Sequence, residues 1–247
     1  MSQLDLSLAA GVSARHISFV ETGRAQPSRE VILRLSGALG LNLRDVNALL
    51  HAAGLPREFR ESELDVKWPD AIERAVTRML AQQEPYPMIV LNLRHDVLRG
   101  NQAAFRLLGH FVEDPQALGA RPNLLHAIFD PRLMRSSITD WPRLARTMLT
   151  RLQREALARP ADGSIPALIA ELCNLPGVPE HWREPALDLP ATPTLEFEAA
   201  RGADRVRFLT TLTVFNSALD VTLEEVQLES FFPVDEQTEA LCRKLAS

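Results

Sequence analysis

Short segments with hydrophobic residues at helical spacing fill positions 1–55 of the chain. This pattern predicts helices over 3–10, 14–22, 28–38 and 43–53. A serine oxygen can accept an unpaired amide of a first helical turn, and three of these helices are preceded by a serine: Ser2, Ser13 and Ser28. A glycine can end a helix in the left-handed conformation at little cost, and three glycines follow these helices: Gly11, Gly23 and Gly54.

The pattern changes twice after position 55. Positions 56–68 are polar and begin with a proline, so they predict a linker between a domain at 1–55 and a second domain at 69–247. The second domain opens with a helical pattern at 70–83. A short apolar run, MIVLNL, follows two prolines at 88–93, and RHDVLRGN at 94–101 then leads into a helix that Asn101 is placed to cap.

The rest of the second domain mixes helical and alternating patterns. Further helices are expected at 102–109, 122–129, 131–136, 141–158, 163–174 and 235–246. Five prolines between 176 and 193 predict a loop, and strands are expected at 194–200, 205–216 and 223–232, with a turn at 201–205. The fold class is therefore a mainly α N-terminal bundle followed by an α+β domain.

Composition and charge narrow the class of protein. The 247 residues are 46% hydrophobic and 24% charged, which is ordinary for two globular domains. Residues 1–62 hold seven Arg and six acidic residues (+1), and the remainder holds 20 basic and 26 acidic residues (−6), which together give −5. No apolar stretch of about 18 residues and no leader pattern is present, so we expect a cytoplasmic protein. The two cysteines, Cys173 and Cys242, are expected to be buried free thiols.

Positions 2–28 carry the most specific motif. Two short helices are joined by a tight turn at Gly11, and their contact is expected to bury Leu6, Ala10, Val12, Ile17 and Val20. Such a unit places its second helix in the major groove of DNA. Over 1–55 the chain resembles the Xre/lambda-repressor helix-turn-helix family, which implies a DNA-binding transcriptional regulator.

The resemblance implies particular contacts with DNA. Gln3 matches a position that contacts phosphate, and the helix capped by Ser13 presents Ala14, Arg15, Ser18 and Phe19 to the groove, with His16 beside them. Arg15 is the strongest candidate, since a guanidinium can bond guanine O6 and N7 together. Arg24 and the turn at 27–29 are expected to position backbone contacts.

The chain departs from the family pattern at its beginning. In the family a further helix precedes the position of Ser2, and its arginine usually pairs with the glutamate found here as Glu21; Ser7 also stands where alanine is usual. Part of the core formed by Ile17, Ile32, Leu35 and Leu39 is then expected to be open. Two explanations stay open, a start codon upstream of the one assigned, which we favour, and a real truncation. The second implies a non-binding bundle, or a ligand-binding interaction module without DNA binding.

The second domain resembles the PAS-like ligand-binding domain of MmyB-like regulators. The resemblance is carried by 85–109, 123–141 and 228–245. It implies an apolar pocket for a fatty-acid-like molecule, and the candidate lining residues are Met88, Val90, Phe105, Leu108, Phe129, Met134, Trp141, Phe208 and Leu212. The same residues are compatible with a plain core. Arg99 and Arg207 are weak candidates for binding a carboxylate.

Other chemistry is not indicated. The six histidines are scattered, and no metal-ligand cluster, nucleophile motif or phosphate loop is found, so we expect neither an enzyme, a metal site nor a cofactor beyond a bound fatty acid. Binding of haem through His95 or His126 is disfavoured. By analogy with other helix-turn-helix proteins we expect a homodimer on a two-fold operator, regulated by a ligand-dependent population shift.

Overall fold

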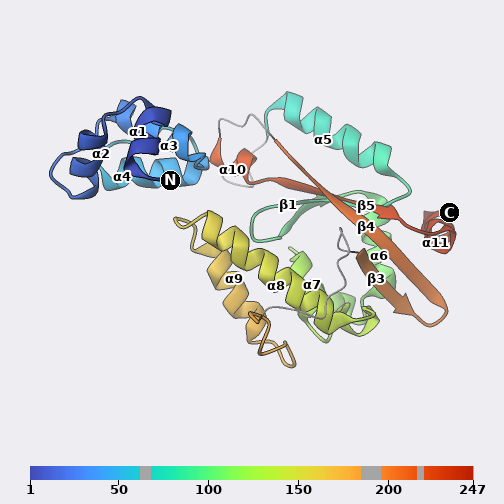
Figure 1. Cartoon of the computed structure of the whole chain (residues 1–247). Helices are drawn as coiled ribbons and strands as arrows, with labels where there is room; N and C mark the ends of the chain where they lie inside the picture. The colour runs from blue at the N-terminus through green and yellow to red at the C-terminus, as the bar shows by residue number, and fades with distance from the viewer. Residues whose placement is uncertain (62–67, 185–195, 216–219, 247) are drawn as a thin grey trace. The chain divides into compact units, whose positions relative to one another are not determined.

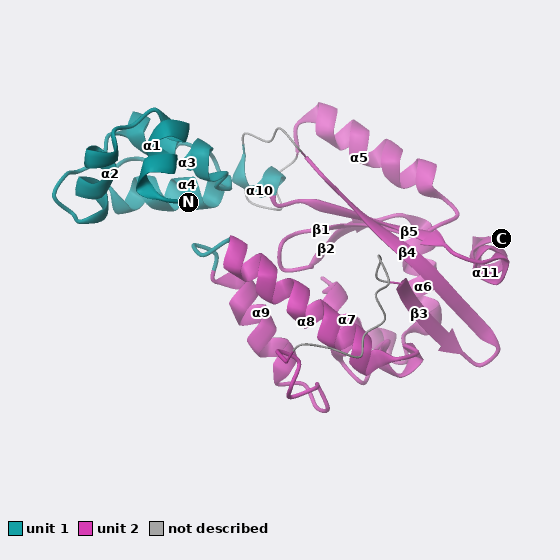
Figure 2. Ribbon diagram, in the orientation of Figure 1, with its two compact units in different colours: residues 1–63, 159–162, 216–224 teal, residues 64–158, 163–215, 225–247 magenta. Residues whose placement is uncertain are grey.

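A computed structural model describes residues 1–61, 68–184, 196–215 and 220–246 of the chain. It divides into two compact units (Figure 2). Unit 1 comprises 1–63, 159–162 and 216–224, and unit 2 comprises 64–158, 163–215 and 225–247. Parts of the predicted linker, of the predicted proline-rich loop and of two predicted strands, at 62–67, 185–195 and 216, lie outside the described residues. Among the described helices, none combines the length and the apolar character needed to span a bilayer.

Unit 1 is helical, as its hydrophobic pattern predicts. Its helices are α1 (Gln3–Ala10), α2 (Ala14–Glu21), α3 (Arg29–Leu39), α4 (Leu43–Ala52) and the short α10 (Val221–Glu224). The three predicted serine caps are confirmed: each hydroxyl oxygen accepts the amide three residues later. Gly11 follows α1 at a φ of 63°, where a side chain would be strained. Local capping therefore sets where these helices begin and end.

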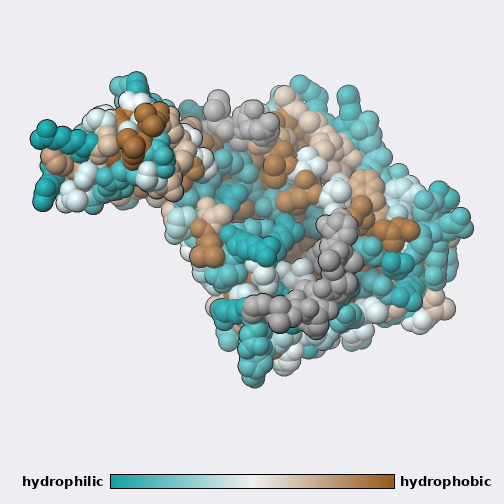
Figure 3. All heavy atoms as spheres, viewed as in Figure 1, coloured by the Kyte–Doolittle hydropathy of each residue, from teal (hydrophilic) through white to brown (hydrophobic). Residues whose placement is uncertain are grey.

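The core of unit 1 is small. Ile17 packs with Ala10 and Val12, and Ile32 packs with Val46 and Leu50. Of the core that was expected to be open in part, Ile17 and Ile32 are buried, whereas Leu39 is 46% exposed. On α1, Leu4 and Leu8 are 62% and 76% exposed. Figure 3 shows hydrophobic residues gathered on the surface of this unit.

Two segments from later in the chain complete unit 1. The backbone amide of Ala161 donates to Asp45 on α4 over 3.1 Å, and the amide of Leu43 donates to Glu224 of α10 over 2.8 Å. The amide of Val221 donates to the carbonyl of Arg60 over 2.9 Å. The first turn of α4, and Arg60 in the segment after α4, are therefore hydrogen-bonded to residues that follow α8 or β4 in sequence.

Unit 2 contains a five-stranded antiparallel sheet in its described residues. The strands are β1 (Met88–Leu91), β2 (Val97–Gly100), β3 (Glu196–Arg201), β4 (Asp204–Val214) and β5 (Gln227–Pro233), in the order β2-β1-β5-β4-β3. Strand β2 was not expected, since 94–101 was predicted only to lead into a helix. The strand expected at 223–232 begins at Gln227, because the Asp220 carboxylate accepts the amide of Leu223 and initiates α10.

The helices of unit 2 follow the predicted ranges closely. They are α5 (Asp70–Gln83), α6 (Gln102–Phe111), α7 (Leu124–Phe129), α8 (Trp141–Ala158), α9 (Ser164–Cys173) and α11 (Glu236–Ala246), with 3-10 turns η1 (Pro115–Leu118) and η2 (Arg135–Ser137). The helix expected at 131–136 is wrong and is replaced by η2 at its end. The Asp130 carboxylate accepts the amide of Arg132 over 2.9 Å, a local bond that competes with helix formation.

The two faces of the sheet pack against different helices (Figure 1). Helix α5 covers one face, where Val76 and Leu80 meet Val90 and Leu228. Helices α6 to α9 lie on the other face, over a larger core that includes Phe111, Leu149 and Leu168. This arrangement confirms the expected α+β class and is consistent with a PAS-like domain.

The two cysteines differ in their surroundings. Cys242 on α11 is buried, as expected, and burial raises the pKa of its thiol to about 11. Cys173 is exposed, so the expectation of burial is wrong for it. It is the last residue of α9, whose buried side is formed by Ile165, Leu168 and Leu172.

Candidate functional sites

The turn between α1 and α2 holds the two helices of the N-terminal motif together. Beyond the left-handed Gly11, the amide of Val12 donates to the carbonyl of Ser7 over 3.2 Å, and the Ser13 hydroxyl accepts the amide of His16 over 3.2 Å. Ile17 on α2 is only 2% exposed. These contacts fix which side of α2 is buried and which side is left to solvent.

The open side of α2 presents Arg15 and Phe19. The Arg15 guanidinium carbon lies 5.3 Å from the centroid of the Phe19 ring. Arg15 is exposed, and Ala14, His16 and Ser18 are partly exposed. The structure therefore places all the expected groove-facing residues on α2 within one short, accessible helix.

Gln3 and Glu21 join the beginning of α1 to the end of α2. The Gln3 side-chain amide donates to the Glu21 carboxylate, and both residues are exposed. The amide oxygen of Gln3 is not used in this bond. Gln3 is thus held beside the second helix of the motif, where the family resemblance expects a phosphate contact.

The arginines of unit 1 differ in whether a carboxylate neutralises them. Arg29 pairs with Glu58, and Arg34 pairs with Glu30 over 2.7 Å. Within the described ranges Arg15 and Arg24 form no ion pair, and both are exposed. Exposed, uncompensated guanidinium groups are suited to phosphates and to base edges. The two arginines that the motif assigns to DNA are therefore free for that role.

An apolar cavity opens in unit 2 between the sheet and helices α6 and α7. Its volume is about 870 Å³ when all the space between its walls is counted, including the solvent at its open mouth. Its lining is almost entirely hydrophobic and consists of Pro87, Ile89, Val97, Ala104, Phe105, Leu107, Leu108, Pro122, Asn123, Leu124, Ala127, Ile128, Met134, Met148, Phe197, Thr210, Glu229 and Phe231.

The residues proposed from the sequence fall into three groups around this cavity. Phe105, Leu108 and Met134 line it. Phe129, Trp141 and Phe208 are buried in the surrounding core. The third group does not line the cavity: Met88 and Val90 pack against α5, and Leu212 is 42% exposed.

Strand geometry explains why Met88 and Val90 lie elsewhere. Successive side chains of a strand point to opposite faces, so Ile89 reaches the cavity while its two neighbours reach α5. The sequence predicts that side chains alternate between the two faces of the sheet, but it does not indicate which face holds the cavity. Cross-strand pairing decides that, because Ile89 is opposite Glu229 on β5.

Glu229 is a residue of the cavity that the sequence reading missed. It is 7% exposed, and burial raises the pKa of its carboxyl. The available signal was an acidic residue within the apolar run LESFF of β5. A buried carboxyl is costly unless something compensates it, so its position in the wall of an apolar cavity calls for an explanation.

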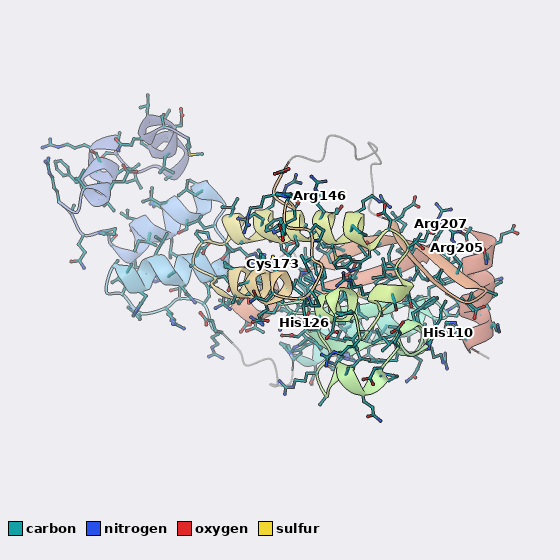
Figure 4. All side chains as sticks on the ribbon, turned by 90° about the horizontal axis from the view of Figure 1, so that it is seen from below. His110, His126, Arg146, Cys173, Arg205 and Arg207 are labelled. Carbon is teal, nitrogen blue, oxygen red and sulfur yellow. The ribbon has the colours of Figure 1, made fainter. Side chains whose placement is uncertain are left out.

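The two arginines considered as carboxylate anchors are engaged elsewhere. Arg99 pairs with Glu73 over 2.7 Å and also donates to Thr77. Arg207 pairs with Glu196 over 2.8 Å, and Figure 4 shows it beside Arg205 on β4. Neither arginine lines the cavity.

Comparison with known proteins adds two family matches. Residues 1–46 match a helix-turn-helix family, and residues 72–245 match the MmyB-like transcription regulator ligand binding domain. Both families are regulatory. No curated protein matches the chain.

A solved structure titled "Structure of an RNA-binding Light-Oxygen-Voltage Receptor" is similar to the chain at 13% identity and a TM-score of 0.33. The match covers 98% of this chain and spans 55% of that one, and a likeness at this level carries no argument about function. The family match over 72–245 covers more than half of the chain. The protein therefore belongs to the family of helix-turn-helix regulators with an MmyB-like ligand-binding domain.

Proposed function

We propose that this regulator reads a specific DNA sequence through α2 and responds to a small, apolar, fatty-acid-like ligand held in unit 2. The observation that carries the DNA part is the contrast among its arginines. Arg15 and Arg24 are exposed and lack an ion pair among the described residues, while Arg29 and Arg34 are paired with glutamates. Arg15 and Arg24 both lie within residues 1–46, which match the helix-turn-helix family.

The residues that are expected to contact DNA have separate roles in this proposal. Arg15 reads a guanine, with Ala14, His16, Ser18 and Phe19 contacting the neighbouring groove surface. Gln3 and Arg24 contact phosphates and set the register, which adds affinity without sequence preference. Ser13 keeps the first turn of α2 in place through its bond to the amide of His16.

The ligand part of the proposal rests on the cavity. Its apolar lining suits a hydrocarbon chain, since removing apolar surface from water is favourable by about 25 cal/mol per Å². The sequence also links this cavity to unit 1: Thr210 of β4 and Glu229 of β5 line it, and α10 lies between these strands in the chain. Because α10 bonds to Leu43 at the start of α4, the stretch of chain between β4 and β5 includes part of unit 1.

We extend the proposal to assembly and place of action. One α2 helix covers few base pairs, so two copies on a two-fold operator would double the sequence that is read. Because its proposed partner is DNA, we expect the regulator to act in the cytoplasm.

The test of the DNA function begins with selection of binding sequences from a random double-stranded pool by the full-length protein. We expect one enriched motif, and we expect its affinity to fall steeply as salt rises because phosphate contacts release counterions. A shuffled oligonucleotide of equal composition is the control. Absence of any enriched sequence at low salt would overturn the DNA function.

A rival function has one observation in its favour. The exposure of Leu4 and Leu8 on α1 is compatible with a ligand-binding interaction module that does not bind DNA. The same selection separates the two, since such a module enriches no sequence. Native mass spectrometry of the purified full-length chain tests the ligand part: we expect a small hydrophobic molecule to be released on unfolding.

A further inference from the structure

The outer edge of β4 is only partly covered by β3. Strand β3 pairs with β4 from Asp204 to Leu209, and β4 then continues past the start of β3 to Val214 (Figure 1). Over 210–214 the inner edge of β4 pairs with β5, whereas no residue in the described part of the chain pairs with its outer edge. We propose that this free edge, 210–214, is the surface through which two copies of the chain pair as antiparallel strands. The inference rests on the two-copy assembly proposed for this regulator and names its interface.

The alternation of an antiparallel ladder determines which main-chain groups lie on the free edge. Both groups of one residue point to the same neighbouring strand, and those of the next residue point to the opposite side. The carbonyl of Arg207 accepts the amide of Val234, directly after β5, so the odd-numbered residues of β4 face β5. Thr210, Leu212 and Val214 therefore turn their amides and carbonyls to the free edge.

The residues of the free edge favour another strand as the partner. The segment TTLTV has no charge, whereas the covered part of β4 contains Asp204, Arg205 and Arg207. Exposed edge strands usually carry charges, prolines or bulges that prevent further pairing. Positions 210–214 have none of these features, and the side chains of Leu212 and Val214 are 42% and 53% exposed. An exposed, uncharged and regular edge of this kind is suited to pair with a further strand.

The length and register of the free edge fit a second copy of itself. A two-fold axis through Leu212 places that residue opposite its own copy, with 210 opposite 214 and 211 opposite 213. Each outward-facing residue then exchanges two hydrogen bonds with its partner, which gives six bonds for three pairs. Threonine faces threonine at 211 and 213, a pair that stabilises antiparallel strands. Because β3 begins opposite Leu209 and β4 ends at Val214, the second copy fills this stretch without displacing β3.

A continuation of β3 is a poorer partner for the same edge. In the register of the β3–β4 pair it would put Pro193 opposite Leu212. Leu212 directs both of its main-chain groups to that edge, and a proline has no amide to donate there. The second copy offers both an amide and a carbonyl at this position. A second copy therefore completes the hydrogen bonding of the edge, and an extended β3 does not.

The size of this interface predicts a weak dimer in free solution. A standard stable interface involves about 20–30 residues on each side, whereas this one uses the residues at 210–214 and their neighbours. We therefore expect the free protein to exchange between monomer and dimer at micromolar concentrations. A two-fold operator would hold two copies close together, so a weak contact between them is enough on DNA.

The first experiment crosslinks the full-length protein through a cysteine placed at the proposed axis. Leu212→Cys and Val214→Cys are each combined with Cys173→Ser, which removes the exposed native thiol, and are treated with a short bis-maleimide without DNA. Leu212 would face its own copy at about 5.5 Å between Cα atoms, whereas two copies of Val214 would be ~14 Å apart. We expect Leu212→Cys to form covalent dimer at least tenfold faster than its matched control, Val214→Cys.

A second variant tests the hydrogen bonds of the edge. Leu212→Pro removes an amide that points away from β5, and a proline is tolerated at such a position of an edge strand. We expect sedimentation velocity to show at least a tenfold loss of dimer affinity, with an unchanged circular dichroism spectrum. If this variant does not fold, the crosslinking comparison decides the inference.

Three results would overturn the proposed interface. A full-length protein that stays monomeric at several hundred micromolar does so, and it leaves the reading of DNA by α2 standing, because the selection of sequences tests that function separately. Equal crosslinking through 212 and 214 shows that Leu212 does not lie on a two-fold axis. A folded Leu212→Pro variant with undiminished dimer affinity places the contact between copies elsewhere on the protein.

Discussion

The guanidinium carbon of Arg15 lies 5.3 Å from the centre of the Phe19 ring, one helical turn further along α2. A cation over an aromatic ring is attracted by about 0.5–1 kcal/mol at an exposed site. This contact limits the positions that the arginine samples without neutralising its charge. The side chain is thereby partly ordered before it meets DNA, which lowers the entropy lost on binding.

The Arg15 side chain is expected to contribute specificity at one base pair. Replacing it in Arg15→Ala should weaken binding to the selected sequence by about 1–3 kcal/mol, because a bidentate contact with guanine is lost. Fluorescence anisotropy on the selected duplex and on its single-base variants measures both affinity and preference.

A matched control is available on α3. Arg34 is exposed like Arg15 but is paired with Glu30, so Arg34→Ala should change affinity by much less. If Arg15→Ala weakens binding equally on every sequence, the residue acts on phosphates and the assigned base contact is wrong.

Local signals explain how much of unit 1 could be predicted. Ser13 and Gly11 act on the residues beside them, so the limits of α1 and α2 follow from the sequence alone. The segment at 221–224 shows the opposite case. It has the composition of a strand, but the cap at Asp220 and the bond between Val221 and Arg60 hold it as a helix.

Pairing between distant segments limited the prediction of unit 2. Nothing in 94–101 alone indicates β2, whose residues are held by pairing with Ile89 and Val90 of β1. The cavity is similar: Phe105 and Leu108, which line it, were among the apolar candidates that the family resemblance implied. Glu229 needed the register of β5 against β1, which a single sequence does not supply.

Asn101 is expected to be a main determinant of the stability of unit 2. Its side-chain oxygen accepts the amides of Met88 and Ala104 over 3.0 Å each, and its side-chain nitrogen donates to the carbonyl of Tyr86 over 2.8 Å. Asn101→Ala removes a helix cap and leaves buried groups without partners, so unfolding free energy should fall by about 2–4 kcal/mol.

Urea denaturation followed by circular dichroism measures this loss. The neighbouring Gln102 is exposed, and Gln102→Ala should stay within about 0.5 kcal/mol of the unaltered protein. If Asn101→Ala lowers the unfolding free energy no more than the control does, the hydrogen bonds of the Asn101 side chain contribute little to stability.

His95 is expected to make stability depend on pH in the acid range. Burial lowers the pKa of His95 from 6.5 to about 4; the charge of Arg151 adds to this effect, whereas the charges of Glu155 and Asp96 oppose it. The unfolded chain therefore binds this proton more readily than the folded chain. The full stability of the fold with a neutral His95 is therefore present above pH 6.5. As pH falls toward 4, protonation of His95 in the unfolded chain lowers the unfolding free energy, on the order of 3 kcal/mol in total.

The variant His95→Asn isolates this effect. His95 has a φ of 60°, a conformation that asparagine tolerates better than most residues. The difference in unfolding free energy between the unaltered protein and the variant should shrink as pH is lowered from 7 to 4. A difference that is independent of pH would show that His95 is protonated to the same extent in both states.

The final prediction concerns the space that the ligand would fill. Leu108 of α6 is partly buried and lines the cavity, so Leu108→Trp should occupy part of it and weaken binding of decanol at least tenfold. The variant should leave DNA affinity without ligand unchanged. The matched control is Leu157→Trp on α8, where the leucine is 73% exposed and does not line the cavity. Calorimetry on both variants makes the comparison, and undiminished binding by Leu108→Trp would place the ligand in a different part of the protein.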